Sequence, residues 1–169
     1  MGLTHATSLA QDLEQDYAMT DPSRLDRLFQ AMPPVAAMQV HALDFDGHTL
    51  RLGAPLSANV NDKACAFGGS LAGVMTLAGW GWLTLAAQDA GLASDVYVAD
   101  SQVRYIAPLF EDLVAEACLR PGQDWDAILR TLAERRRTSA SMLAQVVAAD
   151  GTVVATLEAR FALKRTATP

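Results

Sequence analysis

An uncharged run over residues 64–88 limits what this chain can fold into more than any other feature. Uncharged apolar runs of 18 or more residues are candidates for membrane-spanning helices. This run is diluted by glycines, and no cluster of Lys or Arg flanks it to set an orientation in a membrane; the glycines are Gly68, Gly69, Gly73, Gly79 and Gly81. A helix that is apolar all round can instead form the buried centre of a domain. We therefore predict a core helix at about 69–90 and no membrane partner.

Length and composition indicate one domain with a substantial core. The chain has 169 residues, of which 51% are hydrophobic, and about 150 residues is an ordinary domain size. The first 20 residues are polar, and apolar periodicity begins only after them. We expect a polar N-terminal segment at 1–20, a single domain at 21–165 and a short tail at 166–169.

Charge and metal-ligand spacing exclude several function classes. The 13 Lys and Arg against 19 Asp and Glu give a net charge of −6, whereas nucleic-acid binding depends on a basic face, so we expect no nucleic-acid partner. The three histidines and two cysteines show no metal-ligand spacing, so we predict neither a metal nor another cofactor. Cys65 and Cys118 form no disulfide framework, and no secretory signal opens the chain, which favours the reducing cytoplasm.

The remaining periodicity predicts an antiparallel sheet. Asp-Gly pairs between apolar runs are strong hairpin signals; Asp46-Gly47 and Asp150-Gly151 each lie in such a position. Asp21-Pro22 is typical of a helix start, and we expect Pro33-Pro34 to stop that helix. Another short helix opens at Asp124. The expected strands span 38–45, 48–55, 95–108, 112–119, 138–149 and 152–164. This order predicts an α+β fold, with the central helix covering the apolar face of the sheet.

Four segments in this order resemble a known family. They are 54–61 (APLSANVN), 67–71 (FGGSL), 76–81 (TLAGWG) and 99–108 (ADSQVRYIAP). Over residues 20–164 the chain resembles the hotdog-fold thioesterase family that occurs alone or as the C-terminal half of an acetyltransferase fusion. The resemblance implies an antiparallel sheet wrapped around a long central helix. It also implies a homodimer or a dimer of dimers, because the second apolar face of the helix and the long strands indicate a partner subunit.

The resemblance also implies chemistry on acyl thioesters. Members of the family are associated with decarboxylation of malonyl-acyl carrier protein to acetyl-acyl carrier protein, which feeds the start of fatty-acid synthesis. The expected partner is therefore a thioester of acyl carrier protein or coenzyme A. Two alternatives stay open, namely a thioesterase that hydrolyses the same bond and a protein that binds acyl thioesters without turnover.

The start of the central helix is the candidate catalytic site. Gly68, Gly69 and Ser70 would present free N–H groups at a helix N-terminus, which binds anions. A thioester carbonyl placed there would be stabilised as it becomes an oxyanion or enolate, by about 2.7–4 kcal/mol for one donor. Phe67 directly precedes these residues and is a candidate substrate contact. The alternative is a tight turn into the helix without a ligand.

An asparagine before the glycines completes the candidate site. The resemblance implies that Asn61, seven residues before Gly68, faces the substrate carbonyl, where its neutral amide can donate a hydrogen bond. Asn59 competes for this role. The alternative for either residue is a local turn bond in a polar loop.

Thr76 marks a departure from the better-known thioesterases. About eight residues after the glycines, many hotdog thioesterases carry an Asp or Glu that acts as base or nucleophile, whereas this chain has no carboxylate between 64 and 88. Hydrolysis needs an activated water or nucleophile, and loss of carbon dioxide from a malonyl thioester does not. The absent carboxylate favours decarboxylation. Thr76 is a candidate substrate contact, with a bond to its own helix backbone as the alternative.

The other candidate substrate contacts lie later in the chain. Asp100 and Ser101 are expected in mid-strand, where one of them could approach the helix of a partner subunit and Asp100 could supply an acid. Arg104, Arg136 and Arg137 could meet the phosphates of a phosphopantetheine arm or an acidic carrier protein. The alternatives are an ion pair between Asp100 and Arg104 and a solvated helix end for the arginines.

Overall fold

The computed structural model describes residues 21–166; the predicted N-terminal segment (1–20) and the last residues of the predicted tail (167–169) lie outside that range. The helices are α2 (Arg24–Gln30), α3 (Pro33–Met38), α4 (Gly68–Asp89) and α5 (Trp125–Arg135), with a short 3-10 turn at Leu56–Ala58. The strands are β1 (His41–Phe45), β2 (Thr49–Ala54), β3 (Ser94–Tyr105), β4 (Leu113–Leu119), β5 (Arg137–Val147) and β6 (Val153–Arg165).

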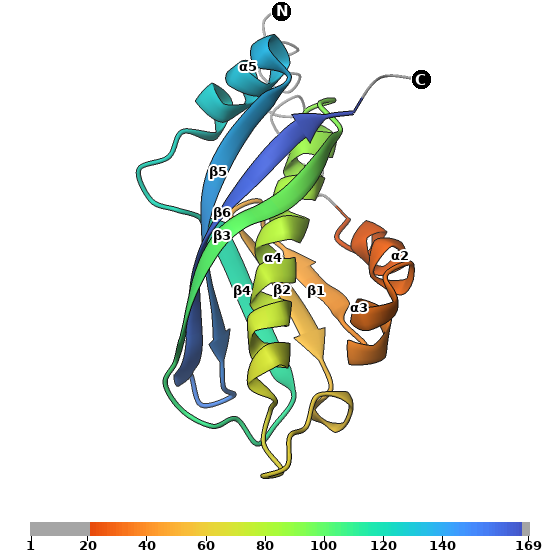
Figure 1. The fold of residues 1–169 in the computed structure, drawn as a ribbon, viewed down its shortest axis with the longest axis vertical. Helices are drawn as coiled ribbons and strands as arrows, with labels where there is room; N and C mark the ends of the chain where they lie inside the picture. The colour runs from red at the N-terminus through yellow and green to blue at the C-terminus, as the bar shows by residue number, and fades with distance from the viewer. Residues whose placement is uncertain (1–20, 167–169) are drawn as a thin grey trace, which may run out of the picture.

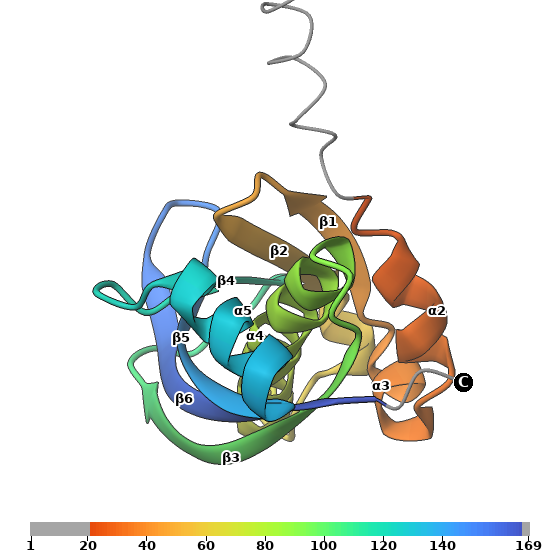
Figure 2. The ribbon, with the colours of Figure 1, turned by 90° about the horizontal axis from the view of Figure 1, so that it is seen from above.

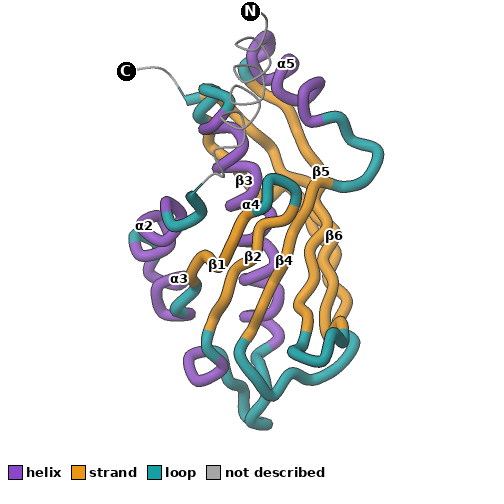
Figure 3. The backbone as a smooth tube through the Cα atoms, turned by 180° about the vertical axis from the view of Figure 1, so that it is seen from behind, coloured by secondary structure: helices purple, strands orange, loops and turns teal. Residues whose placement is uncertain are grey.

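The described strands form one antiparallel sheet that curves around α4 (Figures 1 and 2). The strand order is β1-β2-β4-β5-β6-β3; α4 packs against β2, β4, β5, β6 and β3, and its Trp82 meets Phe45 of the edge strand β1 edge-on. Seen from behind, β1, β2, β4 and β5 lie in front of α4, and α2 and α3 lie beside β1 (Figure 3). This is the hotdog architecture, so the predicted α+β fold is confirmed.

The core lies between α4 and the concave face of the sheet. Alternate residues of each inner strand point at the helix, as a period of two requires. Fully buried side chains of the sheet and of α4 meet there: Leu50, Leu52, Leu113, Met142, Leu157 and Phe161 with Val74, Met75, Ala78 and Leu85. The helix has a mean hydropathy of 1.3 over its most apolar 18 residues, enough to cross a bilayer by composition, and 67% of that window is buried inside the fold. The prediction of a core helix is therefore confirmed.

The two Asp-Gly hairpins are confirmed. β1 pairs with β2 and β5 with β6, and Gly47 and Gly151 have φ angles of +86° and +85°, which glycine adopts without strain. In the first turn, the Asp46 carboxylate accepts hydrogen bonds from the backbone N–H groups of Thr49 and His48 at 2.7 and 2.8 Å. These bonds hold the pKa of Asp46 below its ordinary value of 3.8, and the bond from Thr49 contributes more to this shift than the bond from His48.

The lowered pKa of Asp46 predicts an acid-dependent loss of stability. Since the unfolded chain binds the proton more tightly, the stabilisation is complete above about pH 4 and is lost as the pH falls through the folded pKa. We expect Asp46→Asn, which keeps a hydrogen-bond acceptor, to reduce this loss by less than about 1 kcal/mol, because the group is exposed and screened. Urea unfolding of both proteins at pH 5, 3 and 2 measures the free energy of unfolding. An equal decrease with falling pH in the two proteins would contradict the prediction.

The N-terminal helices differ from the prediction. Ser23 stands at the N-cap position of α2 without a side-chain capping bond, and the helix begins at Arg24. The Asp21 carboxylate accepts bonds from the Ser23 N–H and hydroxyl. Pro33-Pro34 does not merely follow a helix end: it begins the new helix α3, and the following strand starts at His41 instead of residue 38. Proline lacks an N–H and has φ fixed near helical values, so it suits the first turn of a helix as well as the position after one.

Candidate active site

The first turn of α4 presents free backbone donors at one end of the sheet. Phe67 is the N-cap, with extended backbone angles, and its carbonyl accepts the first helical bond from the Leu71 N–H at 3.0 Å. The N–H groups of Gly68, Gly69 and Ser70 donate to no acceptor within residues 21–166. Aligned peptide dipoles add partial positive charge at this end. The predicted donor set is therefore present, and a carbonyl or carboxylate oxygen fits it.

Aromatic side chains line this helix start. The Tyr105 hydroxyl donates to the Gly68 carbonyl at 3.1 Å, and a Cβ atom at Gly68 would lie 3.5 Å from the Tyr105 ring. A Cβ atom at Gly69 would overlap the Phe67 ring. Phe67 and Tyr105 are both exposed, so they form an apolar rim beside the free amides. Glycine at both positions leaves the room that these two rings occupy beside the backbone.

The structure holds Asn61 with its amide nitrogen nearly unused. Its Oδ1 accepts from the N–H groups of Lys63 at 2.8 Å and Cys65 at 3.3 Å, which fixes the orientation of the side-chain amide. Among the residues that the structure describes, Nδ2 donates only to the Cys65 thiol sulfur, at 3.3 Å, and sulfur is a weak acceptor. Asn61 is half-buried. The side-chain oxygen of Asn61 makes the local turn bonds, while its nitrogen is held by one weak bond to sulfur. Its role in turnover stays a prediction.

Asn59 has a different environment. The side chain is 2% exposed, and Nδ2 donates to the carbonyls of Met38 at 2.9 Å and Pro55 at 2.8 Å. The Asn59 carbonyl accepts from the Phe67 N–H at 2.7 Å, and Oδ1 has no hydrogen-bond partner in the part of the chain that the structure describes. Asn59 therefore ties α3, the loop after β2 and the start of α4 together, and both of its amide hydrogens are occupied.

Thr76 and the nearby acids supply no base. The Thr76 hydroxyl donates to the Ala72 carbonyl at 2.8 Å, the backbone bond that small hydroxyl residues often make within helices. Asp62 pairs with Lys63 in the exposed loop at 2.9 Å. Within residues 21–166 no carboxylate or imidazole bonds to Asn61 or to the first turn of α4, and no group of three or more metal-ligating side chains is found.

The β3 candidates divide between the two faces of the sheet. Asp100 pairs with Arg160 of β6 at 2.6 Å, so the ion pair expected with Arg104 is wrong. A bulge between Val98 and Asp100 shifts the register there. Asp100 and Arg104 lie opposite exposed or half-buried residues of the outer face, whereas Ser101 lies opposite the buried Ala159 and faces α4. Within one chain, Asp100 and Arg104 are therefore not brought to the start of α4.

Arg136 and Arg137 lie at the other end of the sheet. Arg136 ends α5 with φ +59°, and Arg137 begins β5. The 22 residues of α4 separate this end from Gly68 by about 33 Å at 1.5 Å per residue. One chain therefore does not place these two arginines beside the free amides.

The comparisons with known proteins assign the family. A family model described as "Putative thioesterase (yiiD_Cterm)" matches residues 24–165, most of the chain. The chain belongs to this thioesterase family. None of the proteins with curated functions matches it. The membership confirms the resemblance found in the sequence, and it makes this a hotdog protein of the class that acts on acyl thioesters.

Solved structures share the fold over nearly their whole length. A protein from Chlorobaculum tepidum aligns with a TM-score of 0.80 at 24% identity, covering 88% of this chain and 98% of that one. A protein from Shewanella oneidensis described as a "putative thioesterase" aligns at 0.72 and 27% identity, covering 84% and 97%. One from Pseudomonas aeruginosa aligns at 0.70 and 23% identity, covering 88% and 99%.

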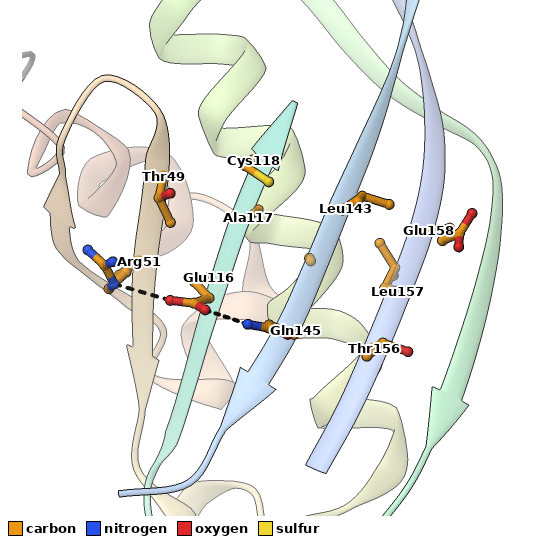
Figure 4. A pocket seen from close by; sticks show the side chains of 11 residues that line it. Thr49, Arg51, Glu116, Ala117, Cys118, Leu143, Gln145, Thr156, Leu157 and Glu158 are labelled. Carbon is orange, nitrogen blue, oxygen red and sulfur yellow. Dashed lines mark hydrogen bonds and ion pairs between the residues drawn. The ribbon is translucent and has the colours of Figure 1, made fainter. Parts of the chain in front are cut away.

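A hollow lies on the outer face of the sheet, away from the start of α4 (Figure 4). Its volume is about 470 Å³, and β2, β4, β5 and β6 line it. Arg51 bonds to Glu116 at 3.3 Å, and Glu116 accepts from Gln145 at 2.6 Å. Burial, with the Glu116 charge, raises the pKa of the Cys118 thiol. Arg51, Glu116 and Gln145 satisfy one another, and the raised pKa disfavours the thiolate form of Cys118, so the first turn of α4 is the better candidate. Alternation of Thr49, Arg51 and Glu116 with apolar residues is the sequence signal for this face.

Proposed function

We propose that the chain binds a malonyl thioester at the start of α4 and decarboxylates it to the acetyl thioester. The observation that carries this is a set of donors to which no carboxylate or imidazole of residues 21–166 bonds: the N–H groups of Gly68, Gly69 and Ser70, which have no acceptor there, and the Asn61 amide, which has only the weak Cys65 sulfur. Donors stabilise a developing enolate oxygen, and decarboxylation needs nothing more from the protein than this and a suitable orientation.

The reaction proceeds in two steps. The bond between the α-carbon and the carboxylate carbon breaks, carbon dioxide leaves, and the electron pair passes into the thioester to form an enolate. The helix amides and Asn61 Nδ2 hold the enolate oxygen. The α-carbon then takes a proton from water, which gives the acetyl thioester. Phe67 and Tyr105 would exclude water from the departing carboxylate, whose loss is favoured in an apolar setting.

Hydrolysis is the second candidate, and family membership favours it. It needs a base to activate water, and among residues 21–166 of one chain none bonds to the first turn of α4. A thioesterase would therefore take its acid from a partner subunit. Ser101, which faces α4, and Asp100 beside it are the β3 residues best placed to cross such an interface.

We propose that the partner is a second copy of the chain. β3 is a 12-residue strand at the edge of the sheet, and its Tyr97 and Val98 are 57% and 49% exposed. Long apolar edges readily pair with another strand, so two copies of β3 can join antiparallel into one sheet; a dimer of dimers would need a further interface. The free cysteines suit the reducing cytoplasm, where we place the reaction.

Intact mass spectrometry tests the reaction. Malonyl-acyl carrier protein, malonyl-CoA and acetyl-CoA are each incubated with the protein. We expect a malonyl substrate to lose the mass of carbon dioxide with its thioester retained. A free thiol instead would establish the thioesterase, and binding without any change in mass would establish the non-catalytic alternative.

A further inference from the structure

A cluster of cations stands at the end of the sheet away from the α4 start of the same chain. The basic patch consists of Arg135, Arg136, Arg137, Lys164 and Arg165. Arg137 lies opposite Lys164 in the β5–β6 register, and the Arg165 N–H donates to the Arg136 carbonyl at 2.9 Å. Helix α5 ends where β5 begins, which places Arg135 beside them. Five cations are thus gathered on a chain whose net charge is −6.

The basic patch lacks ion pairs with acidic side chains of the described residues, although Arg136 donates a hydrogen bond to the Thr166 carbonyl at 3.3 Å. Arg24, Arg51, Arg120 and Arg160 each form an ion pair, whereas no side chain of the basic patch has one within residues 21–166. Asp95, opposite Lys164, and Glu134, beside Arg135, are the nearest acids by register and sequence. Unpaired like charges repel one another, so the arrangement favours an anionic partner.

The proposed dimer places the basic patch next to a catalytic site. Arg165 and Lys164 lie opposite Ser94 and Asp95 at the start of β3, while Tyr105 at its end bonds to Gly68. When two copies of β3 pair antiparallel, the start of one strand meets the end of the other. With strands about 4.8 Å apart, the strand of Arg165 lies about 10 Å from the backbone of Tyr105 of the partner subunit. Each patch thus flanks the α4 start of the other subunit.

We infer that the basic patch docks the acidic surface of an acyl carrier protein and delivers its thioester to the site of the partner subunit. This rests on the proposed function and on the β3 dimer. Four of the five cations are exposed, and exposed ion pairs contribute only about 0–1 kcal/mol each. Tight binding to this surface therefore needs many contacts spread over α5, β5 and β6. A protein partner can make that many contacts, whereas a single phosphate group cannot.

Charge reversal tests the docking. We expect Arg135→Glu/Lys164→Glu to raise KM for malonyl-acyl carrier protein about 30-fold, while kcat and the turnover of malonyl-N-acetylcysteamine, which has no carrier, change less than twofold. Arg27→Glu/Arg120→Glu makes the same change in net charge elsewhere and should leave KM for the carrier within threefold. Equal KM increases in the two variants would overturn the docking, and an equal increase for malonyl-CoA would assign the patch to phosphates instead.

Mixed dimers test the delivery between subunits. Subunits with Asn61→Ala are refolded together with subunits carrying Arg135→Glu/Lys164→Glu. In a mixed dimer, the intact site of the charge-reversed subunit lies beside the intact patch of the Asn61→Ala subunit. We therefore expect turnover of malonyl-acyl carrier protein to exceed the sum of the turnovers of the two parent dimers. No excess would show that the patch serves its own chain or neither. If the unaltered protein turns over neither malonyl-acyl carrier protein nor malonyl-N-acetylcysteamine, the proposed function itself fails, independently of the patch.

Discussion

Asn61→Ala is expected to lower kcat by about 10²–10³-fold, the loss typical of removing one oxyanion donor. The Lys63 and Cys65 N–H groups hold the amide oxygen, and the amide nitrogen has only a weak bond to the Cys65 sulfur among residues 21–166. KM should change little, since the bond strengthens mainly as the enolate forms. Single-turnover mass spectrometry of the malonyl thioester measures the loss.

Asn59→Ala is the matched control. It leaves the Met38 and Pro55 carbonyls without their donors in a buried setting, which costs about 1–3 kcal/mol for a buried group. We expect a lower free energy of unfolding in urea and nearly normal kcat per folded molecule. A normal kcat in Asn61→Ala would remove Asn61 from catalysis. A collapsed kcat in fully folded Asn59→Ala would assign the donor role to Asn59.

The fold was predictable because its signals are local. The uncharged run at 64–88 and the two Asp-Gly turns each specify their own element within a few residues. Pro33-Pro34 does follow the end of α2 at Gln30, but the new helix α3 was missed, because proline is equally suited to following a helix and to beginning one. The choice between these depends on how α3 packs beside β1, which periodicity does not encode.

The site was predictable only in part, because its partners are distant in sequence. Asn59 bonds to Met38, 21 residues away, so its structural role could not be read from the loop. Asp100 was given Arg104 as a partner, but four residues along a strand span about 13 Å. Its real partner, Arg160, is on the neighbouring strand. The separation of the arginine cluster from Gly68 likewise follows from topology alone.

Gly81→Ala is expected to lower the free energy of unfolding by about 1–3 kcal/mol, the usual cost of overpacking a core. A Cβ atom at Gly81 would lie 2.8 Å from Leu25 Cδ1 and 2.9 Å from Leu50 Cδ2, and both leucines are fully buried. They join α2, α4 and β2 at this point, so neither side chain can retreat without moving an element. Replacing a helical glycine gains only about 1 kcal/mol.

Gly73→Ala is the same substitution on the same helix where the neighbour can yield. Its Cβ atom would lie 3.2 Å from Met38 Cε, the end of a flexible side chain that is itself only half-buried. The gain in helix propensity should therefore dominate, leaving Gly73→Ala as stable as the unaltered protein or up to about 1 kcal/mol more stable. Urea unfolding of the two variants side by side measures the difference. If both were equally stable, Leu25 and Leu50 would have to repack freely, and the close approach of α4 to the sheet at Gly81 would not be what requires a glycine there.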